Sequence, residues 1–246
     1  MQYMGSKNRF AKELVPIIQS YITKETKGYL EPFVGGANII DKIECDKKFG
    51  CDLNEYLIEL LKFTRDTPEN LPSIISEEEY NDVMNNVNNY EKWYVGFVGF
   101  LCSFSRKFFG GYARGKNNNG TLRNYANESF RNLNNQSSNL KGIIFKSCSF
   151  QDINTNISNY IIYCDPPYKG TTKYKTGQFP YEEYYDWCRE MSKNNIVLCS
   201  EYWMPDDFEC IWEKETKVNF DSNRSNNDNK NNRTEKLFIL KVAEDL

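Results

Sequence analysis

The stretch Tyr160-Ile-Ile-Tyr-Cys-Asp-Pro-Pro-Tyr168 decides how the rest of the chain is interpreted. Its apolar and aromatic start favours a buried strand, and two prolines must end that strand because proline lacks the N–H that a sheet ladder needs. The strand therefore stops at Asp165, whose carboxylate is expected at the carboxyl edge of a sheet, where open α/β sheets bind ligands. Pro166 and Pro167 stiffen the turn that leads to Tyr168. The stretch predicts a binding or catalytic site.

Composition excludes several classes of protein. A chain of 246 residues is long enough for one substantial core with a smaller insert. It contains no histidine, which removes Ser-His-Asp and Cys-His catalysis and every His-ligated zinc or haem site. The net charge of −3 does not indicate a nucleic-acid partner by itself, so any basic footprint has to be local.

The eight cysteines favour reduced thiols over disulfides or a metal site, because several lie in apolar runs and no C-x-x-C pair is present. The longest apolar window, residues 93–104, is too short to span a bilayer. We therefore expect a cytoplasmic protein with no metal ion and no membrane partner.

The first 65 residues alternate between strand and helix. A strand over residues 29–34 meets Gly35 and Gly36, and a helix is expected from Ala37 to Glu44. A second strand ends at Asp52, and Asn54 can cap a helix that runs to Arg65. This βαβα order favours a parallel sheet.

Residues 66–141 interrupt that order. Helices are expected over residues 77–87 and 90–104 and from about Asn127, separated by a Gly/Asn-rich stretch. We interpret this segment as an inserted, mainly helical domain that carries a hairpin, and residues 1–65 and 142–246 as the catalytic domain.

The alternation resumes after residue 141. Strands are expected at 142–145, 160–164 and 196–199, with a helix over 181–193. Two last strands, 210–218 and 236–242, flank a loop over 219–233 that is rich in asparagine. Two such close strands predict an antiparallel hairpin at the side of an otherwise parallel sheet.

Two acids follow strands and suit different chemistry. The carboxylate of Asp52, at the end of the second strand and about 20 residues past the glycine turn, can accept both hydroxyls of a ribose, although no G-x-G-x-x-G fingerprint is present. Asp165 and the Pro166 carbonyl offer two acceptors for the two N–H groups of an exocyclic amine, while the face of Tyr168 could stack on its ring. This arrangement suits methyl transfer to an amine that is a poor nucleophile.

A basic footprint lies in residues 103–141, where seven basic residues and one acid, Glu128, are interleaved with aromatic rings. Such a pattern suits phosphate contact combined with base readout. A second basic cluster, Lys169, Lys173 and Lys175, follows the Asp165 turn. The residues that we expect to contact nucleic acid are Arg106, Lys107, Arg114, Lys116, Arg123, Asn124 and Lys173, with arginine–guanine pairing as the specific contact.

The chain resembles the Dam-type adenine-specific DNA methyltransferases, especially members encoded by phages. The resemblance covers nearly the whole length and keeps the order of the family's motifs. These motifs are Gly5-Ser-Lys7, Tyr29-Leu-Glu-Pro-Phe-Val-Gly-Gly36, Cys51-Asp-Leu-Asn54, Asp165-Pro-Pro-Tyr168, Ser200-Glu-Tyr202 and Glu235-Lys-Leu-Phe238.

The resemblance implies a Rossmann-like methyltransferase fold and S-adenosylmethionine as cofactor. The implied catalytic residues are Asp165, Pro166, Pro167 and Tyr168. The implied cofactor contacts are Tyr3, Lys7, Glu31, Phe33, Gly35, Asp52, Phe150 and Asp165. Two positions depart from the family pattern: Ala37 replaces a frequent glycine, and Ser149 replaces a frequent aspartate beside Phe150.

The resulting hypothesis is a bacterial or phage-encoded enzyme that methylates N6 of an adenine flipped out of double-stranded DNA. It would act as a monomer or a transient dimer, alone or beside a restriction nuclease. Three alternatives remain: the same chemistry on cytosine N4, RNA or a protein glutamine; a non-catalytic DNA-binding module; and a dinucleotide oxidoreductase.

Overall fold

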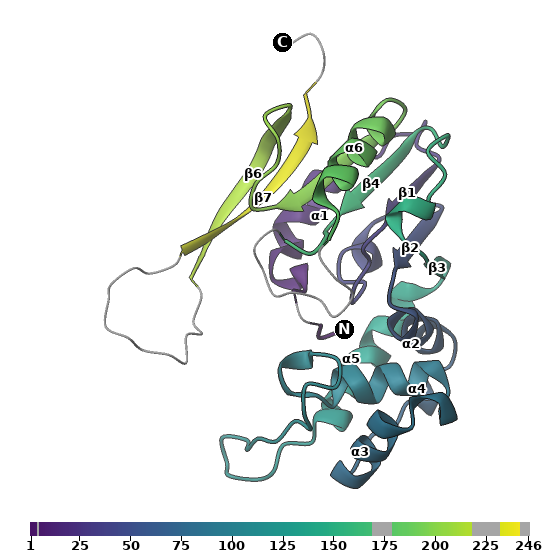
Figure 1. Ribbon diagram of the computed structural model, residues 1–246, viewed down its shortest axis with the longest axis vertical. Helices are drawn as coiled ribbons and strands as arrows, with labels where there is room; N and C mark the ends of the chain where they lie inside the picture. Colours follow the sequence, from purple (N-terminus) through teal and green to yellow (C-terminus); the bar gives the residue numbers. More distant parts are fainter. Residues whose placement is uncertain (4, 169–178, 218–231, 242–246) are drawn as a thin grey trace.

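The computed structural model describes residues 1–3, 5–168, 179–217 and 232–241. These residues form a seven-stranded sheet in the order β3-β2-β1-β4-β5-β7-β6 (Figure 1). Strands β1 to β5 pair in parallel, and β7 runs antiparallel to both of its neighbours, β5 and β6. The strands are β1 Gly28–Glu31, β2 Lys48–Asp52, β3 Ile143–Ser147, β4 Tyr160–Cys164, β5 Ile196–Glu201, β6 Phe208–Lys217 and β7 Asn232–Leu240. The expected mixed, mostly parallel sheet is confirmed.

Strand β4 shows why the sheet is buried on both faces. Ile161 and Tyr163 belong to a core formed with α1, α2, α4 and α5, whereas Ile162 and Cys164 belong to a second core formed with α6. Neighbouring side chains of a strand point to opposite faces, so a continuous apolar run requires cover on both sides. The helices are α1 Ala11–Ser20, α2 Glu55–Asp66, α3 Glu77–Asn85, α4 Lys92–Gly96, α5 Tyr125–Leu140 and α6 Tyr181–Ser192.

Short helical turns join these elements. The 3₁₀ turns are η1 Lys7–Phe10, η2 Ile40–Lys42, η3 Pro68–Asn70, η4 Val87–Asn89, η6 Phe104–Arg106 and η7 Phe150–Asp152, and η5 Phe97–Leu101 is a π-helix. Turn η1 leads directly into α1. Lys7, at its first position, is buried. The chain therefore enters the fold through a rigid turn that carries a buried charge.

The prediction of a helix from Ala37 to Glu44 is wrong. Only the short turn η2 forms there, and Ala37 has φ +54°, which no right-handed helix allows. The Gly36 and Ala37 carbonyls accept hydrogen bonds from the Gln136 side chain on α5, at 3.2 and 3.0 Å. A partner about a hundred residues away in sequence thus satisfies carbonyls that a helix would have used.

The helix expected over 90–104 is also shorter than predicted. Helix α4 ends at Gly96 and continues as the π-helix η5. Gly96 lies so close to α2 that an added Cβ would meet the Tyr56 carbonyl oxygen at 2.3 Å. Tight packing against α2, rather than the apolar spacing alone, sets the course of this segment.

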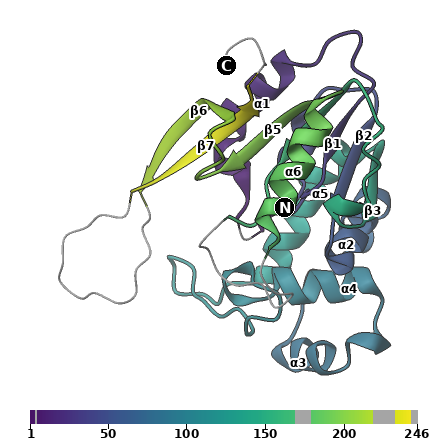
Figure 2. The ribbon, with the colours of Figure 1, turned by 45° about the horizontal axis from the view of Figure 1, so that its top comes forward.

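Helices α3 and α4 lie beyond one end of the sheet, toward which the parallel strands point (Figures 1 and 2). One cluster of buried side chains nevertheless runs from α1 and the sheet through α2 to α4 and α5. The segment 66–141 thus shares a core with the rest of the chain. Its division as a separate domain stays a prediction.

Strands β6 and β7 form the expected antiparallel hairpin, which reaches out from the sheet (Figure 1). Most of the loop predicted over 219–233 lies outside the described residues, although β7 begins at Asn232. No helix among the described residues is both long enough and apolar enough to cross a membrane.

Candidate active site

The Asp165 turn lies where the sequence predicts it, at the carboxyl end of β4. The strand ends at Cys164, and the side chain of Asp165 is 19% exposed. The Tyr181 hydroxyl at the start of α6 donates a hydrogen bond to the Pro167 carbonyl at 2.9 Å. The turn is therefore held both by its prolines and by α6.

A network of buried charges surrounds Asp165. The Lys7 ammonium lies 2.9 Å from the Asp165 carboxylate and 3.5 Å from the carboxylate of Glu235 on β7. The Tyr168 hydroxyl donates a hydrogen bond to Glu235 at 3.0 Å. Arg9 lies 3.6 Å from the other oxygen of Glu235. The Asp165 and Glu235 carboxylates thus share the buried Lys7 ammonium at one end of the sheet, with the exposed Arg9 beside them, which limits the cost of burying the first three charges.

These contacts set the protonation of Asp165. Burial raises its pKa, the Lys7 ammonium opposes that rise, and the Glu235 carboxylate adds to it. Burial disfavours the ammonium form of Lys7, but the carboxylates of Asp165 and Glu235 outweigh burial and raise its pKa. Lys7 therefore remains charged and helps to keep Asp165 ionised.

The Tyr168 ring is more enclosed than its predicted stacking role suggests. The ring is 8% exposed, and the Lys7 ammonium lies over it at 4.3 Å from the centroid. The Tyr202 ring meets it almost at right angles, with centroids 4.6 Å apart. In this arrangement a base cannot stack on Tyr168 unless the ring or its neighbours move.

The glycine turn and Asp52 form a second polar centre. The Asp52 carboxylate accepts hydrogen bonds from the backbone N–H groups of Gly35, at 3.1 Å, and Asn54, at 3.0 Å. Gly35 has φ +48°, and the Tyr3 ring lies against it. Burial raises the pKa of Asp52, and these two backbone donors oppose the rise.

Glu31 is less accessible than a ligand contact would be. It is 2% exposed, and its carboxylate accepts a hydrogen bond from the Tyr29 hydroxyl at 2.8 Å. Burial raises the pKa of Glu31 well above its usual value. A direct contact of Glu31 with a cofactor stays a prediction.

Aromatic rings line the space beside the glycine turn. Phe33 lies 5.7 Å from Phe150 and 5.8 Å from both Phe179 and Tyr184, measured between ring centroids. Phe150 is 4% exposed and follows Ser149, which caps the turn η7 together with Asp152. The serine that departs from the family pattern therefore has a local structural role.

The predicted DNA-contacting residues differ in how freely they could reach phosphate. Lys107 and Lys116 are exposed, and Arg114 is paired with Glu77 on α3. Arg123 makes two bonds to Glu128, at 2.5 and 2.7 Å, and lies over the Tyr125 ring.

Two further predicted contacts have internal partners. The Arg106 guanidinium bonds the Leu101 carbonyl and the Gln2 side chain, and Asn124 caps α5 by accepting from the Asn127 N–H at 2.9 Å. Their side chains are thus partly committed to holding the fold. Lys173 lies outside the described residues, as do Lys169 and Lys175.

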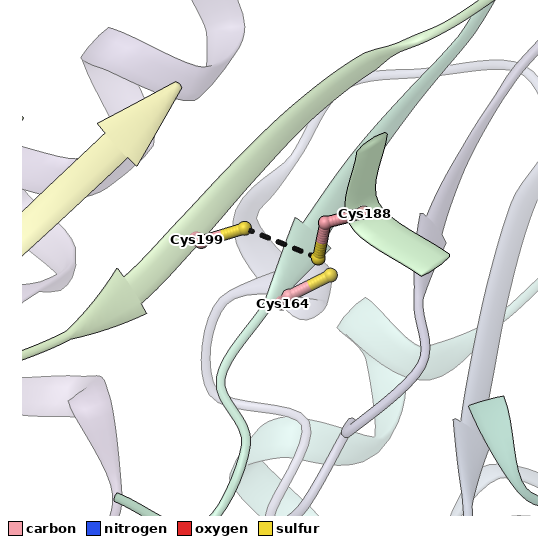
Figure 3. Close-up of side chains that lie close together, drawn as sticks. All are labelled: Cys164, Cys188 and Cys199. Atoms are coloured by element: carbon pink, nitrogen blue, oxygen red, sulfur yellow. Dashed lines mark hydrogen bonds between the residues drawn. The ribbon is translucent and has the colours of Figure 1, made fainter. Parts of the chain in front are cut away.

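Three thiols lie directly behind the Asp165 turn. Cys164, Cys188 and Cys199 come from β4, α6 and β5 and point toward one another, with their sulfur atoms within 4.8 Å (Figure 3). All three are fully buried, and burial raises the pKa of Cys164 and Cys188. Hydrogen bonds with the Cys164 and Cys188 thiols lower the pKa of Cys199. The three side chains pack as small, buried groups. All eight cysteines of the chain are free thiols.

Reasoning from the sequence missed the role of Glu235 and of Arg9. The motif Glu235-Lys-Leu-Phe238 matches the order of the family's motifs, but its place in the sequence does not indicate a role for Glu235. The signal that could have found it is an acid at the start of a terminal strand that must run antiparallel. Such a strand brings its first residues to the carboxyl edge of the parallel strands.

Comparison with known families decides the reaction class. A family model described as the D12 class N6 adenine-specific DNA methyltransferase matches residues 3–220. The chain belongs to this family. It is therefore an enzyme, and its reaction is the methylation of adenine in DNA. A comparison with curated proteins gave no match.

The match to the D12-class methyltransferases covers the glycine turn, Asp52 and the Asp165 turn, which the fold brings to one edge of the sheet. It ends before β7, so Glu235 lies beyond the matched residues.

Proposed function

We propose that this enzyme transfers the methyl group of S-adenosylmethionine to the exocyclic N6 of an adenine that is flipped out of double-stranded DNA. The observation that carries the proposal is the Asp165 turn, in which a largely buried carboxylate is held beside a lysine at the end of β4. The roles of the individual residues are part of the proposal.

The residues beside the glycine turn fit the cofactor. Each oxygen of Asp52 accepts one backbone N–H, and each retains a lone pair that could accept a ribose hydroxyl. The Phe33 and Phe150 rings offer apolar packing for the adenine of the cofactor. S-adenosylmethionine supplies an electrophilic methyl group carried on a positively charged sulfur.

Asp165 and the Pro166 carbonyl would accept the two N–H groups of the target amine. These hydrogen bonds draw the nitrogen lone pair out of conjugation with the ring and toward tetrahedral geometry, which makes the amine a better nucleophile. Orientation of this kind can lower a barrier by about 7 kcal/mol or more. Because burial raises the pKa of Asp165, its carboxylate is also a suitable acceptor for the proton that N6 loses on methylation.

The position of the site supports base flipping as part of the proposal. An amine inside a duplex cannot reach a turn at the edge of a sheet, and extrusion of a base costs a few kcal/mol. The segment 66–141, with its exposed basic residues, would bind the duplex beside that edge. Since Tyr168 is 8% exposed and the Tyr202 ring lies against it, entry of the base requires the Tyr202 ring to move while Lys7 stays paired with Asp165.

The test is the substitution Asp165→Ala, measured as transfer of a labelled methyl group from S-adenosylmethionine to duplex DNA. We expect transfer to fall by about a thousand-fold or more, because the amine loses its charged acceptor. DNA binding, measured by fluorescence anisotropy, should be largely retained. Asp186→Ala serves as the matched control, because it removes a carboxylate of α6 whose side chain is 78% exposed.

Sequencing of the methylated DNA with adenine-modification detection identifies the modified atom and the target site. Turnover by Asp165→Ala at the wild-type rate would refute the role of this carboxylate. Modification of cytosine, or of RNA in preference to DNA, would refute the assigned substrate.

A further inference from the structure

We infer that Glu235 is a positioning residue for methyl transfer, because it anchors Tyr168 by its hydroxyl and shares the Lys7 ammonium with Asp165. The inference rests on the proposed function. It concerns a residue of β7 that lies outside the family match and that reaches Asp165 through Lys7 and Tyr168.

Topology explains how a residue so late in the chain reaches the site. Strand β7 runs antiparallel to β5, with Ser200 opposite Leu237 and Glu201 opposite Lys236. Glu235 is the next residue, and it therefore lies at the edge where the parallel strands end. Its side chain is 7% exposed and points into the charge network rather than to solvent.

Glu235 is the only described residue that joins Lys7, Arg9 and Tyr168. Its two carboxylate oxygens have different partners. Oε2 accepts the Tyr168 hydroxyl at 3.0 Å and lies 3.5 Å from Lys7, while Oε1 faces Arg9 at 3.6 Å. The ring of Tyr168 is fixed at its far end by this bond. The Lys7 ammonium, fixed between two carboxylates, has few other positions available to it.

The charge of Glu235 also acts on Asp165. The groups that face Asp165 are Lys7 on η1, Glu235 on β7, Tyr168 on its own turn, Tyr163 on β4 and Glu31 on β1. A second carboxylate on the same ammonium makes ionisation of Asp165 harder. Removing only that charge should therefore make Asp165 ionise at lower pH.

Two substitutions separate geometry from charge. Glu235→Gln keeps an oxygen that accepts the Tyr168 hydroxyl but removes the negative charge, whereas Glu235→Ala removes both. We expect the plateau kcat of Glu235→Gln to stay within a few-fold of the wild-type value. The acid limb of its pH–rate profile should move to lower pH by about 0.5 pH unit or more. Glu235→Ala should lower kcat by roughly ten- to a hundred-fold, since a small displacement of a reacting group has effects of that size.

Tyr168→Phe tests the anchor from its other end. This substitution should lower kcat by itself. It should add little to the loss seen in Glu235→Ala, because both changes remove the same hydrogen bond, from the Tyr168 hydroxyl to Glu235. Glu213→Gln is the matched control: this exposed glutamate of β6 pairs with Lys236 on the same hairpin and should leave the profile unchanged. Thermal melting of each variant reports whether the fold persists.

The inference is overturned if Glu235→Ala retains full activity, or if Glu235→Gln and Glu235→Ala lose activity equally with an unmoved acid limb. A second measurement does not depend on turnover. Titration of the Asp165 carboxyl by ¹³C NMR, assigned with Asp165→Asn, should give a lower pKa in Glu235→Gln than in the wild type. Wild-type protein that methylates no DNA would refute the proposed function, whereas an unchanged Asp165 titration would refute the inference about Glu235.

Discussion

Charged side chains have opposite surroundings at the carboxyl edge of the sheet and in the basic footprint, residues 103–141. At the edge, Lys7 and Glu235 are each less than a tenth exposed, and each has more than one charged or hydrogen-bonding partner. In the segment, Arg114 and Arg123 lie at the surface, each paired with a single glutamate.

The difference shows which contacts exist before DNA arrives and which must be exchanged when it does. A buried charge that loses its partner is strongly destabilised, so the network around Asp165 is expected to persist through the reaction cycle. An exposed ion pair contributes only about 0–1 kcal/mol, so a phosphate can replace the glutamate partner at little cost.

The largest effect is expected for Lys7→Met. Burial raises the pKa of Asp165 and the Lys7 ammonium opposes that rise, so loss of the ammonium should raise this pKa further. Asp165 must be ionised to accept the amine, and the acid limb of kcat should therefore move to higher pH, opposite to the shift for Glu235→Gln. The rate on the plateau should fall by about a hundred-fold.

Lys12→Met, at an exposed position of α1, is the control for loss of a lysine. The measurement is the pH dependence of single-turnover methyl transfer, which excludes effects of product release. An acid limb that stays in place in Lys7→Met would mean that Lys7 does not govern the ionisation of Asp165. The buried network would then have only a structural role.

The strands at the centre of the sheet were predictable because their apolar runs are local signals. The ends of β2 and β4 at Asp52 and before Asp165 followed from the residue types alone. Ala37 was not predictable in this way. Its positive φ depends on hydrogen bonds from Gln136 on α5, and no local pattern around Ala37 reports that contact.

The same reason limits what could be predicted of the site. The pairing of Lys7 with Asp165 joins the first turn of the chain to the fourth strand, and Glu235 reaches both only through the register of β7. Residue types predicted a chemical role for Asp165. They could not indicate which cation neutralises it, because that depends on the order of strands in the sheet.

An intermediate effect is expected for Arg123→Ala in the exposed segment. Loss of this guanidinium should weaken DNA binding by about three- to ten-fold and reduce the salt dependence by about one unit of slope, as for one phosphate contact. If Arg123 instead bonds a guanine, the variant should become less selective for the base at one position of the target site. Binding is measured by anisotropy over a range of salt concentrations.

Lys193→Ala removes an exposed lysine that directly follows α6 and is paired with Glu190, and it serves as the control. An unchanged affinity, salt slope and target sequence in Arg123→Ala would show that this arginine does not contact DNA. In that case the ion pair of Arg123 with Glu128 would stabilise the fold and would not be exchanged for a contact with phosphate.

The smallest effect, and the one that separates the two regions most directly, is expected for Glu128→Gln. The Arg123 guanidinium holds the pKa of Glu128 below its usual value, so Glu128 is charged and competes with phosphate for Arg123. Its neutralisation should tighten DNA binding by up to about five-fold, the range that an exposed pair allows. The gain should disappear in the double substitution with Arg123→Ala, since the arginine that benefits is then absent. Weaker binding by Glu128→Gln would mean that the pair orients Arg123 toward DNA, and the exposed segment would then be as preorganised as the buried network.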